Sequence, residues 1–365
     1  MKRIIIFPLF CSLLFANELE LLQKDKKELR QLEKEVIEKK YESSKDEWIG
    51  KINLNSSISK ERDFTDDETS DMTRSIGLSF SQSIYESGGI EYSIQYARQQ
   101  LKSDMLAWEN ENIALIQAIY ETLLEIKKLG LQIEQSDYSL KNKEIELILK
   151  RIQYEAGKVD IIELNNAIMS KNNQQKENIS LMNSLKDKEY ELSKYTTLKS
   201  NQIKILDFKI IHKDKFLKDN LNIRYENSKV ELLDTSYKQL KSSYLPQVSL
   251  NTSTTYTNNE NKEQNESGKI GISASMPIFD ITKDSKLEKS KLEVLKQKVN
   301  VTDMQNELIY EYEQILAQIN TYDEYEKTIQ NNLKLYEDLI MVNTSSNSAG
   351  MTADYDLEVL QNTKK

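Results

Sequence analysis

The sequence predicts a mainly α-helical protein with a small β part, organised as two tandem repeats of a β-hairpin followed by long coiled-coil helices. Three observations predict this fold: turn-forming residues are scarce, two strand pairs recur at a constant offset, and apolar residues repeat every seven positions. The 365 residues include 9 glycines and 3 prolines, about 3% of the chain against an average of roughly 12%. Sandwiches, closed barrels and doubly wound sheets need many more turn residues.

The composition also excludes several classes of function. The chain has one histidine, His212, and one cysteine, Cys11, whereas zinc sites and Cys–His nucleophile pairs need more of these residues. No glycine-rich phosphate loop occurs. We therefore expect no enzyme and no cofactor. The net charge of −9, without a basic stripe, argues against a nucleic-acid partner, and the mean hydropathy of −0.64 argues against a polytopic helical membrane protein.

Residues 1–16 have the pattern of a secretory signal peptide. Lys2 and Arg3 form a short basic region, residues 4–15 are largely apolar, and Ala16 precedes a polar segment. The apolar run is too short to span a bilayer, although an uncleaved anchor is the alternative. Cleavage after Ala16 would leave an exported chain without cysteine, and therefore without disulfides.

The rest of the chain is predicted to contain two copies of one unit. Residues 76–85 align with residues 270–279, and Gly157 aligns with Gly350. We expect a first repeat at 17–200, a polar linker at 201–219 and a second repeat at 220–365. The first repeat should contain strands at about 50–59 and 75–85, a long helix at about 89–156 and a return helix at about 158–195. The second should contain a helix at about 220–243, strands at about 247–257 and 269–279, a long helix at about 283–346 and a truncated last helix.

The strands alternate an apolar face with a small polar face. Ile76, Leu78 and Phe80 share one face, while serines and a glycine occupy the other. This period of two fits a soluble sheet packed on one side or a transmembrane barrel. The alternation alone favours the soluble sheet over the transmembrane barrel. The export signal makes this preference smaller. Four strands cannot close a barrel, so a membrane location would require several chains to share one.

The helices carry sustained heptads. Residues 89–156 lack proline and would form roughly 100 Å of helix. In the second repeat, eight apolar positions from Leu287 to Tyr336 keep one heptad phase, and in the first a four-residue step separates Leu115 from Ile119. Such patterns predict coiled-coil packing with a local stutter.

Three ordered motifs in the second repeat resemble those of the TolC-like outer-membrane efflux family, also called outer membrane factors. They are residues 244–250 with sequence YLPQVSL, residues 271–280 with sequence GISASMPIFD, and Gly350 some 70 to 80 residues later. The first repeat departs in detail, since Gly50 stands at the position of Pro246 and Tyr85 at the position of Phe279.

The resemblance implies a homotrimer in the outer membrane of a Gram-negative bacterium. Four strands per protomer would contribute to a shared 12-stranded β-barrel in contact with outer-membrane lipid, and the helices would form an α-helical barrel in the periplasm. The implied function is the exit duct of a tripartite efflux or type I secretion system. It would passively conduct substrates delivered by an inner-membrane transporter and a periplasmic adaptor (membrane fusion protein).

The resemblance also implies site residues at the helix-to-helix turns. The turns expected to contact the adaptor are Gly157, Lys158, Val159 and Asp160 in the first repeat, and Gly350, Met351 and Thr352 in the second. Glu163 and Asp356, each six residues past its glycine, are candidates for the periplasmic aperture. The alternative for each carboxylate is an ordinary solvated helix charge. Thr352 replaces a basic residue expected there, which puts the family's gating salt bridge in doubt.

Two departures from the family pattern remain. The segment 17–47 is highly charged and shorter than usual, and the sequence ends 15 residues after Gly350. We therefore expect the last helix to be truncated. Alternative functions are a periplasmic coiled-coil adaptor or a structural rod protein without a pore, although an adaptor's compact β domain would need more glycine.

Cell fractionation distinguishes these interpretations. The exit duct predicts heat-modifiable trimers in the outer-membrane fraction, because barrels resist detergent until they are heated. A chain recovered only from the periplasm, or as a monomer without a heat-dependent gel shift, would contradict the duct and favour the adaptor or the rod.

Overall fold

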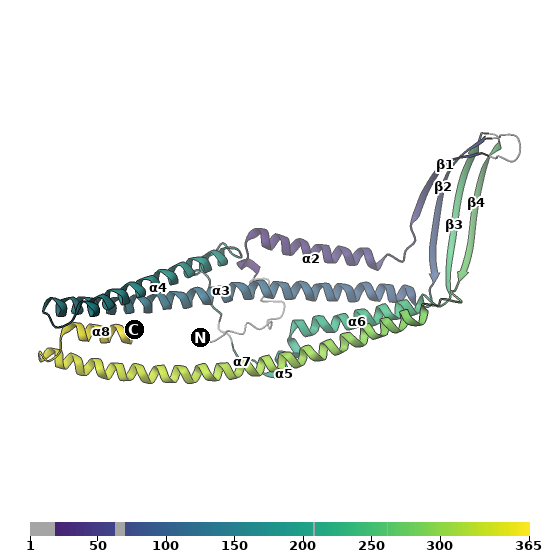
Figure 1. Cartoon of the computed structure of the whole chain (residues 1–365). Helices are drawn as coiled ribbons and strands as arrows, with labels where there is room; N and C mark the ends of the chain where they lie inside the picture. Colours follow the sequence, from purple (N-terminus) through teal and green to yellow (C-terminus); the bar gives the residue numbers. More distant parts are fainter. Residues whose placement is uncertain (1–18, 63–69, 207–208, 261) are drawn as a thin grey trace. The chain divides into compact units, whose positions relative to one another are not determined.

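The computed structural model describes residues 19–62, 70–206, 209–260 and 262–365. It is mainly helical with one small sheet, as the sequence predicts (Figure 1). A short 3-10 helix, η1 (Leu19–Leu21), comes first. It is followed by α2 (Lys24–Lys45), β1 (Ile52–Arg62), β2 (Ser70–Tyr85), α3 (Gly89–Glu155), α4 (Ile161–Ser193), α5 (Lys213–Asp219), α6 (Leu221–Ser242), β3 (Gln247–Asn259), β4 (Lys262–Ser275), α7 (Lys283–Ser348) and α8 (Asp354–Lys364). The expected signal peptide at 1–16 lies outside the described residues.

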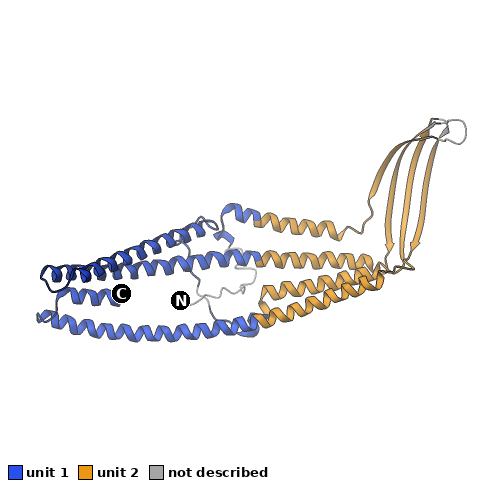
Figure 2. Ribbon diagram, viewed as in Figure 1, with its two compact units in different colours: residues 1–29, 111–217, 308–365 blue, residues 30–110, 218–307 orange. Residues whose placement is uncertain are grey.

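The chain forms two compact units, coloured separately in Figure 2. Unit 1 comprises residues 1–29, 111–217 and 308–365, and unit 2 comprises residues 30–110 and 218–307. The sheet, α6 and most of α2 belong to unit 2, whereas α4 and α8 belong to unit 1. Since α3 and α7 each contribute residues to both units, the division does not follow the boundary between the predicted repeats.

The sheet is antiparallel with strand order β1-β2-β3-β4. Its register aligns Ile52 with Phe80, Phe80 with Thr252 and Thr252 with Ile270. The apolar face is bare: Ile52 is 73% exposed and Ile270 is 80% exposed. The interpretation as a soluble sheet packed on one side is therefore wrong for the part of the chain that the structure describes, because none of its helices covers the apolar face.

Several boundaries differ from those expected. β2 begins at Ser70 and β4 at Lys262, because polar residues of the expected loops extend the antiparallel ladders. β4 ends at Ser275 rather than near residue 279, since Pro277 has no N–H to donate to a ladder. The linker expected at 201–219 includes a helix, α5, whose Phe216 is buried and stacks on Tyr312.

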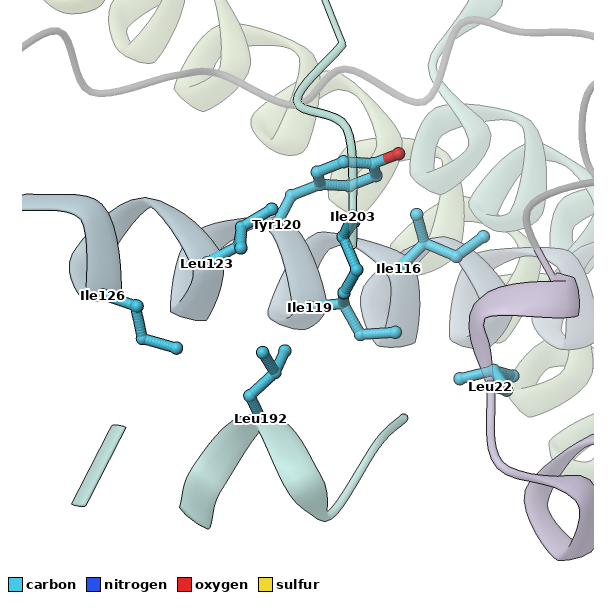
Figure 3. Close-up of a cluster of buried hydrophobic side chains, with 8 residues drawn as sticks. All are labelled: Leu22, Ile116, Ile119, Tyr120, Leu123, Ile126, Leu192 and Ile203. Carbon is cyan, nitrogen blue, oxygen red and sulfur yellow. The ribbon is translucent and has the colours of Figure 1, made fainter. Parts of the chain in front are cut away.

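Unit 1 has its core on one face of α3. Ile119 and Leu123 are fully buried, and the spacing of buried residues along α3 follows the helical period (Figure 3). The cluster comprises Leu22, Ile116, Ile119, Tyr120, Leu123, Ile126, Leu192 and Ile203. Leu192 reaches it from α4 and Ile203 from the segment that follows. The predicted heptad positions Ile119 and Ile126 are thus core residues, and α3 organises this unit.

In unit 2, two reciprocal hydrogen bonds hold α2 against α3. Arg30 Nη2 donates to the carbonyl oxygen of Trp108 at 2.9 Å, and Trp108 Nε1 donates to the carbonyl oxygen of Arg30 at 2.8 Å. The guanidinium also lies 5.6 Å from the Trp108 ring. Arg30 is buried, so its charge requires such partners. The highly charged N-terminal segment therefore packs against α3 through specific contacts, which also include an ion pair between Lys40 Nζ and Asp104 Oδ2 at 2.8 Å.

Residues of the two most specific sequence motifs meet where β4 leads into α7. Asp280 Oδ1 accepts hydrogen bonds from the Thr282 hydroxyl at 2.6 Å and from the Thr282 N–H at 2.8 Å. Tyr244 OH donates to Asp280 Oδ2 at 3.3 Å. The Thr282 hydrogen bonds, with Lys286 nearby, lower the pKa of Asp280 to about 2. The ionised carboxylate of Asp280 therefore fixes the conformation at the start of α7.

The pH dependence of stability tests this role. Because the folded-state pKa is about 2 against an ordinary 3.8, the ionised carboxylate stabilises the fold above about pH 4, and this stabilisation is lost as the pH falls toward 2. We expect Asp280→Asn to lower the thermal unfolding midpoint at pH 7 and the difference from wild type to shrink between about pH 4 and 2. Thr282→Val should raise the lower end of this window, because it removes the hydroxyl that lowers the folded-state pKa of Asp280. A difference independent of pH would contradict the role.

Candidate functional site

The α3–α4 turn closes through a specific backbone pattern. Gly157 has φ of 70°, in the left-handed region that favours glycine. Its N–H donates to the carbonyl of Tyr154 at 2.9 Å, and the Lys158 N–H donates to that of Gln153 at 2.8 Å, which together form a Schellman motif. Asp160 then caps α4 by accepting from the Glu163 N–H at 2.9 Å. The predicted turn residues thus form one compact helix-to-helix connection.

The α7–α8 turn repeats this pattern. Gly350 has φ of 69°, its N–H donates to the carbonyl of Asn347 at 2.9 Å, and the Met351 N–H donates to that of Ser346 at 2.9 Å. Here the cap differs, because Ala353 has no side chain to accept a hydrogen bond. Asn347 instead braces the turn from the other side, since its Nδ2 donates to the Thr352 carbonyl at 3.1 Å and to Asp354 Oδ1 at 2.9 Å.

The two aperture candidates have different surroundings. Both carboxylates are exposed in the first turn of a helix, where the helix dipole favours negative charge. Glu163 Oε2 accepts from Lys150 Nζ at 2.6 Å. Asp356 has no ion-pair partner in the described part of the chain and lines a hollow with Asn142 and Glu146 of α3. Asp356 is therefore the freer of the two charges.

Three residues that hold this region together were not predicted from the sequence. Lys150 meets Glu163 because the chain folds back at Gly157, and its near-symmetrical position before the glycine could have indicated the pair. Asn142 holds α8 against α3, since its Oδ1 accepts from Asn362 Nδ2 at 2.9 Å. Asn347 braces the second turn. The contacts of Asn142 and Asn347 do not depend on a repeat or a periodicity in the sequence, so no sequence pattern predicted them.

The described residues include no helix that is both long and apolar enough to cross a bilayer. No group of three or more His, Cys, Asp or Glu side chains in this part of the chain could hold a metal ion.

The fold, in which two helix-to-helix turns share one backbone pattern, is that of a known class of outer-membrane protein. The profile of the outer membrane efflux protein family matches residues 21–197 and 214–363. The chain belongs to this family, as the resemblance predicted. The family consists of channel proteins, and membership places the chain in the outer membrane of a Gram-negative bacterium.

Solved structures share the fold at low sequence identity. The CmeC outer membrane channel of Campylobacter jejuni superimposes with a TM-score of 0.76 at 14% identity, covering 96% of this chain and 80% of that one. VceC of Vibrio cholerae gives 0.76 at 11% identity, covering 96% and 91%. The open state of the Neisseria gonorrhoeae MtrE channel gives 0.69 at 13%, covering 96% and 82%. A search of curated protein sequences finds no match.

The turn glycines can be tested by one substitution made at two positions. Gly157→Ala should destabilise the fold by about 1 kcal/mol, because alanine is strained at positive φ, although no atom lies within 4 Å of the added Cβ. Gly130, inside α3 and also without neighbours within 4 Å, is the control: Gly130→Ala should stabilise by about 0.5–1 kcal/mol. Denaturant unfolding followed by circular dichroism measures both. The same sign for both variants would contradict this account.

Proposed function

We propose that this chain is the outer-membrane exit duct of a tripartite efflux or type I secretion system. Three copies share one barrel and passively conduct substrates, which an inner-membrane transporter delivers through a periplasmic adaptor. One observation carries the proposal: the four-stranded sheet exposes its apolar face and ends at two strands, β1 and β4, that each have one paired neighbour in the described chain.

Strand geometry supports a shared barrel. The strands have 11, 16, 13 and 14 residues, and about 9–11 tilted residues cross a bilayer. Open edges are not tolerated in lipid, so β4 of one copy must pair with β1 of the next. Two copies would give an eight-stranded barrel, whose interior side chains fill. The polar face here carries small residues such as Ser79, Gly77 and Ser253, which favours the wider, water-filled barrel of three copies.

The adaptor-contact assignment rests on the two turns. Gly157, Lys158, Val159 and Asp160 form the first turn, and Gly350, Met351 and Thr352 form the second. Met351 is 79% exposed, so an apolar side chain stands in solvent at the turn. Because the turns share one backbone pattern, a trimer would present six similar turns to an adaptor.

The periplasmic aperture is assigned to Asp356, with Glu163 as the weaker candidate. Lys150 neutralises Glu163, whereas the carboxylate of Asp356 stays free to act on passing ions. A ring of three such carboxylates would favour cations.

Conductance across planar bilayers tests both the duct and the aperture. Purified wild-type protein should form ion-conducting pores, and its failure to do so as an intact trimer would overturn the proposed function. Asp356→Ala should weaken block by divalent cations and change single-channel conductance, because it removes the carboxylate ring.

The matched control is Glu358→Ala, which removes a carboxylate two residues further along α8. This position lies about 200° around the helix, so conductance and block should stay at wild-type values. An Asp356→Ala trimer with wild-type conductance and cation block would overturn the aperture assignment and leave the duct standing.

A further inference from the structure

The polar face of the sheet is built from uncharged side chains that bind one another. Ser81 Oγ donates to Asn251 Oδ1 at 2.7 Å, and Asn251 Nδ2 donates to Ser273 Oγ at 2.8 Å, so one row of hydrogen bonds joins β2, β3 and β4. Asn55 Nδ2 donates to Ser79 Oγ at 2.9 Å between β1 and β2. These amides and hydroxyls satisfy each other and leave the surface neutral.

One charged residue interrupts this neutral surface. Lys269 is the only charged residue on the polar face within the strand segments 52–58, 75–83, 249–257 and 265–275. The register places it level with Asn53, Ser79 and Ser253. Glu266 of the same strand alternates to the apolar face, opposite Tyr256. Glu61 shares the polar face but lies eight residues further along β1 than Asn53, about 26 Å away.

The charge of Lys269 is not balanced locally. Its ammonium group has no ion-pair partner among the described residues, and it lines a hollow of about 820 Å³ on the sheet together with Asn53, Ser79, Asn251 and Ser253. Its strand neighbour Ile270 is on the bare apolar face. The lysine is therefore level with the apolar band of the sheet.

We infer that Lys269 determines charge selectivity in the barrel, favouring anions over cations. The inference rests on the proposed trimeric duct, in which three copies of Lys269 form a ring. Twelve strands about 4.8 Å apart and tilted by about 40° give a barrel radius of about 12 Å. A lysine side chain reaches roughly 6 Å from its Cα, so each ammonium would lie about 6 Å from the axis.

At this distance the ring acts on the whole cross-section of the pore. The Debye length is about 10 Å at 0.1 M salt and about 3 Å at 1 M. The three charges therefore raise the anion concentration on the axis in dilute salt and lose that effect in concentrated salt. The ring has the opposite sign to the proposed carboxylate aperture, so the two would select against different solutes along one path.

Reversal potentials across bilayers under a KCl gradient test the inference. Lys269→Gln should lower the chloride-to-potassium permeability ratio at least about threefold near 0.1 M salt, and the difference from wild type should vanish near 1 M. The matched control is Lys60→Gln, since Lys60 lies on the opposite face of β1 and should leave the ratio unchanged.

A cysteine variant allows the charge at position 269 to be changed by chemical labelling within one folded channel. Cys11 is the only native cysteine and lies in the expected signal peptide, so Lys269→Cys would introduce a single reactive thiol. A cationic methanethiosulfonate should restore anion preference, and an anionic one should shift the same channels toward cations. The inference would be overturned, and the duct would stand, if the Lys269→Gln and Lys269→Cys channels conduct with wild-type selectivity and neither reagent changes it. A wild-type trimer that does not conduct would overturn the proposed duct and the inference with it.

Discussion

One constraint determines the architecture: backbone N–H and C=O groups of a strand in lipid must be paired within protein. The sheet ends at β1 and β4, each with one row of backbone groups unpaired in a single copy, and residues such as Ile52 and Ile270 need an apolar surrounding. Neither requirement can be met by one chain. In the proposed trimer, association of copies would therefore be part of folding, and the stability of the sheet would depend on protein concentration and on the membrane.

The same constraint explains why the strand-to-helix junctions are built so tightly. A strand held by its neighbours on both sides cannot shift, so the helix that follows must begin at a fixed residue. Asp280 holds Thr282 and Tyr244 at the start of α7, and Ser87 Oγ donates to the Pro246 carbonyl at 2.7 Å next to Gly88, whose φ is 89°. These contacts transmit the register of the sheet to the adjoining helices.

The sequence predicted features that rest on local periodicity. The turn glycines Gly157 and Gly350 and the core position Ile119 follow from heptads and repeats, because each is specified by its neighbours in the chain. Contacts between distant segments were not predicted: Lys150 pairs with Glu163 only after the chain reverses, and the segment 201–219 gave no sign of α5. Polar strand extensions were missed for the same reason, since pairing with a partner strand, not residue type, continues the ladder.

Charge has different consequences in the two kinds of structure. On the helices, exposed pairs such as Lys39 with Glu42 and Lys188 with Glu191 are screened by water and contribute little to stability. On the polar face of the sheet, hydroxyls and amides bind one another, and Lys269 has no ion-pair partner among the described residues, so its charge is not cancelled nearby. In the proposed barrel, a wall of low dielectric would concentrate its field in the enclosed water. One residue in the strands would then govern permeation more strongly than many of the charges that make the whole chain acidic.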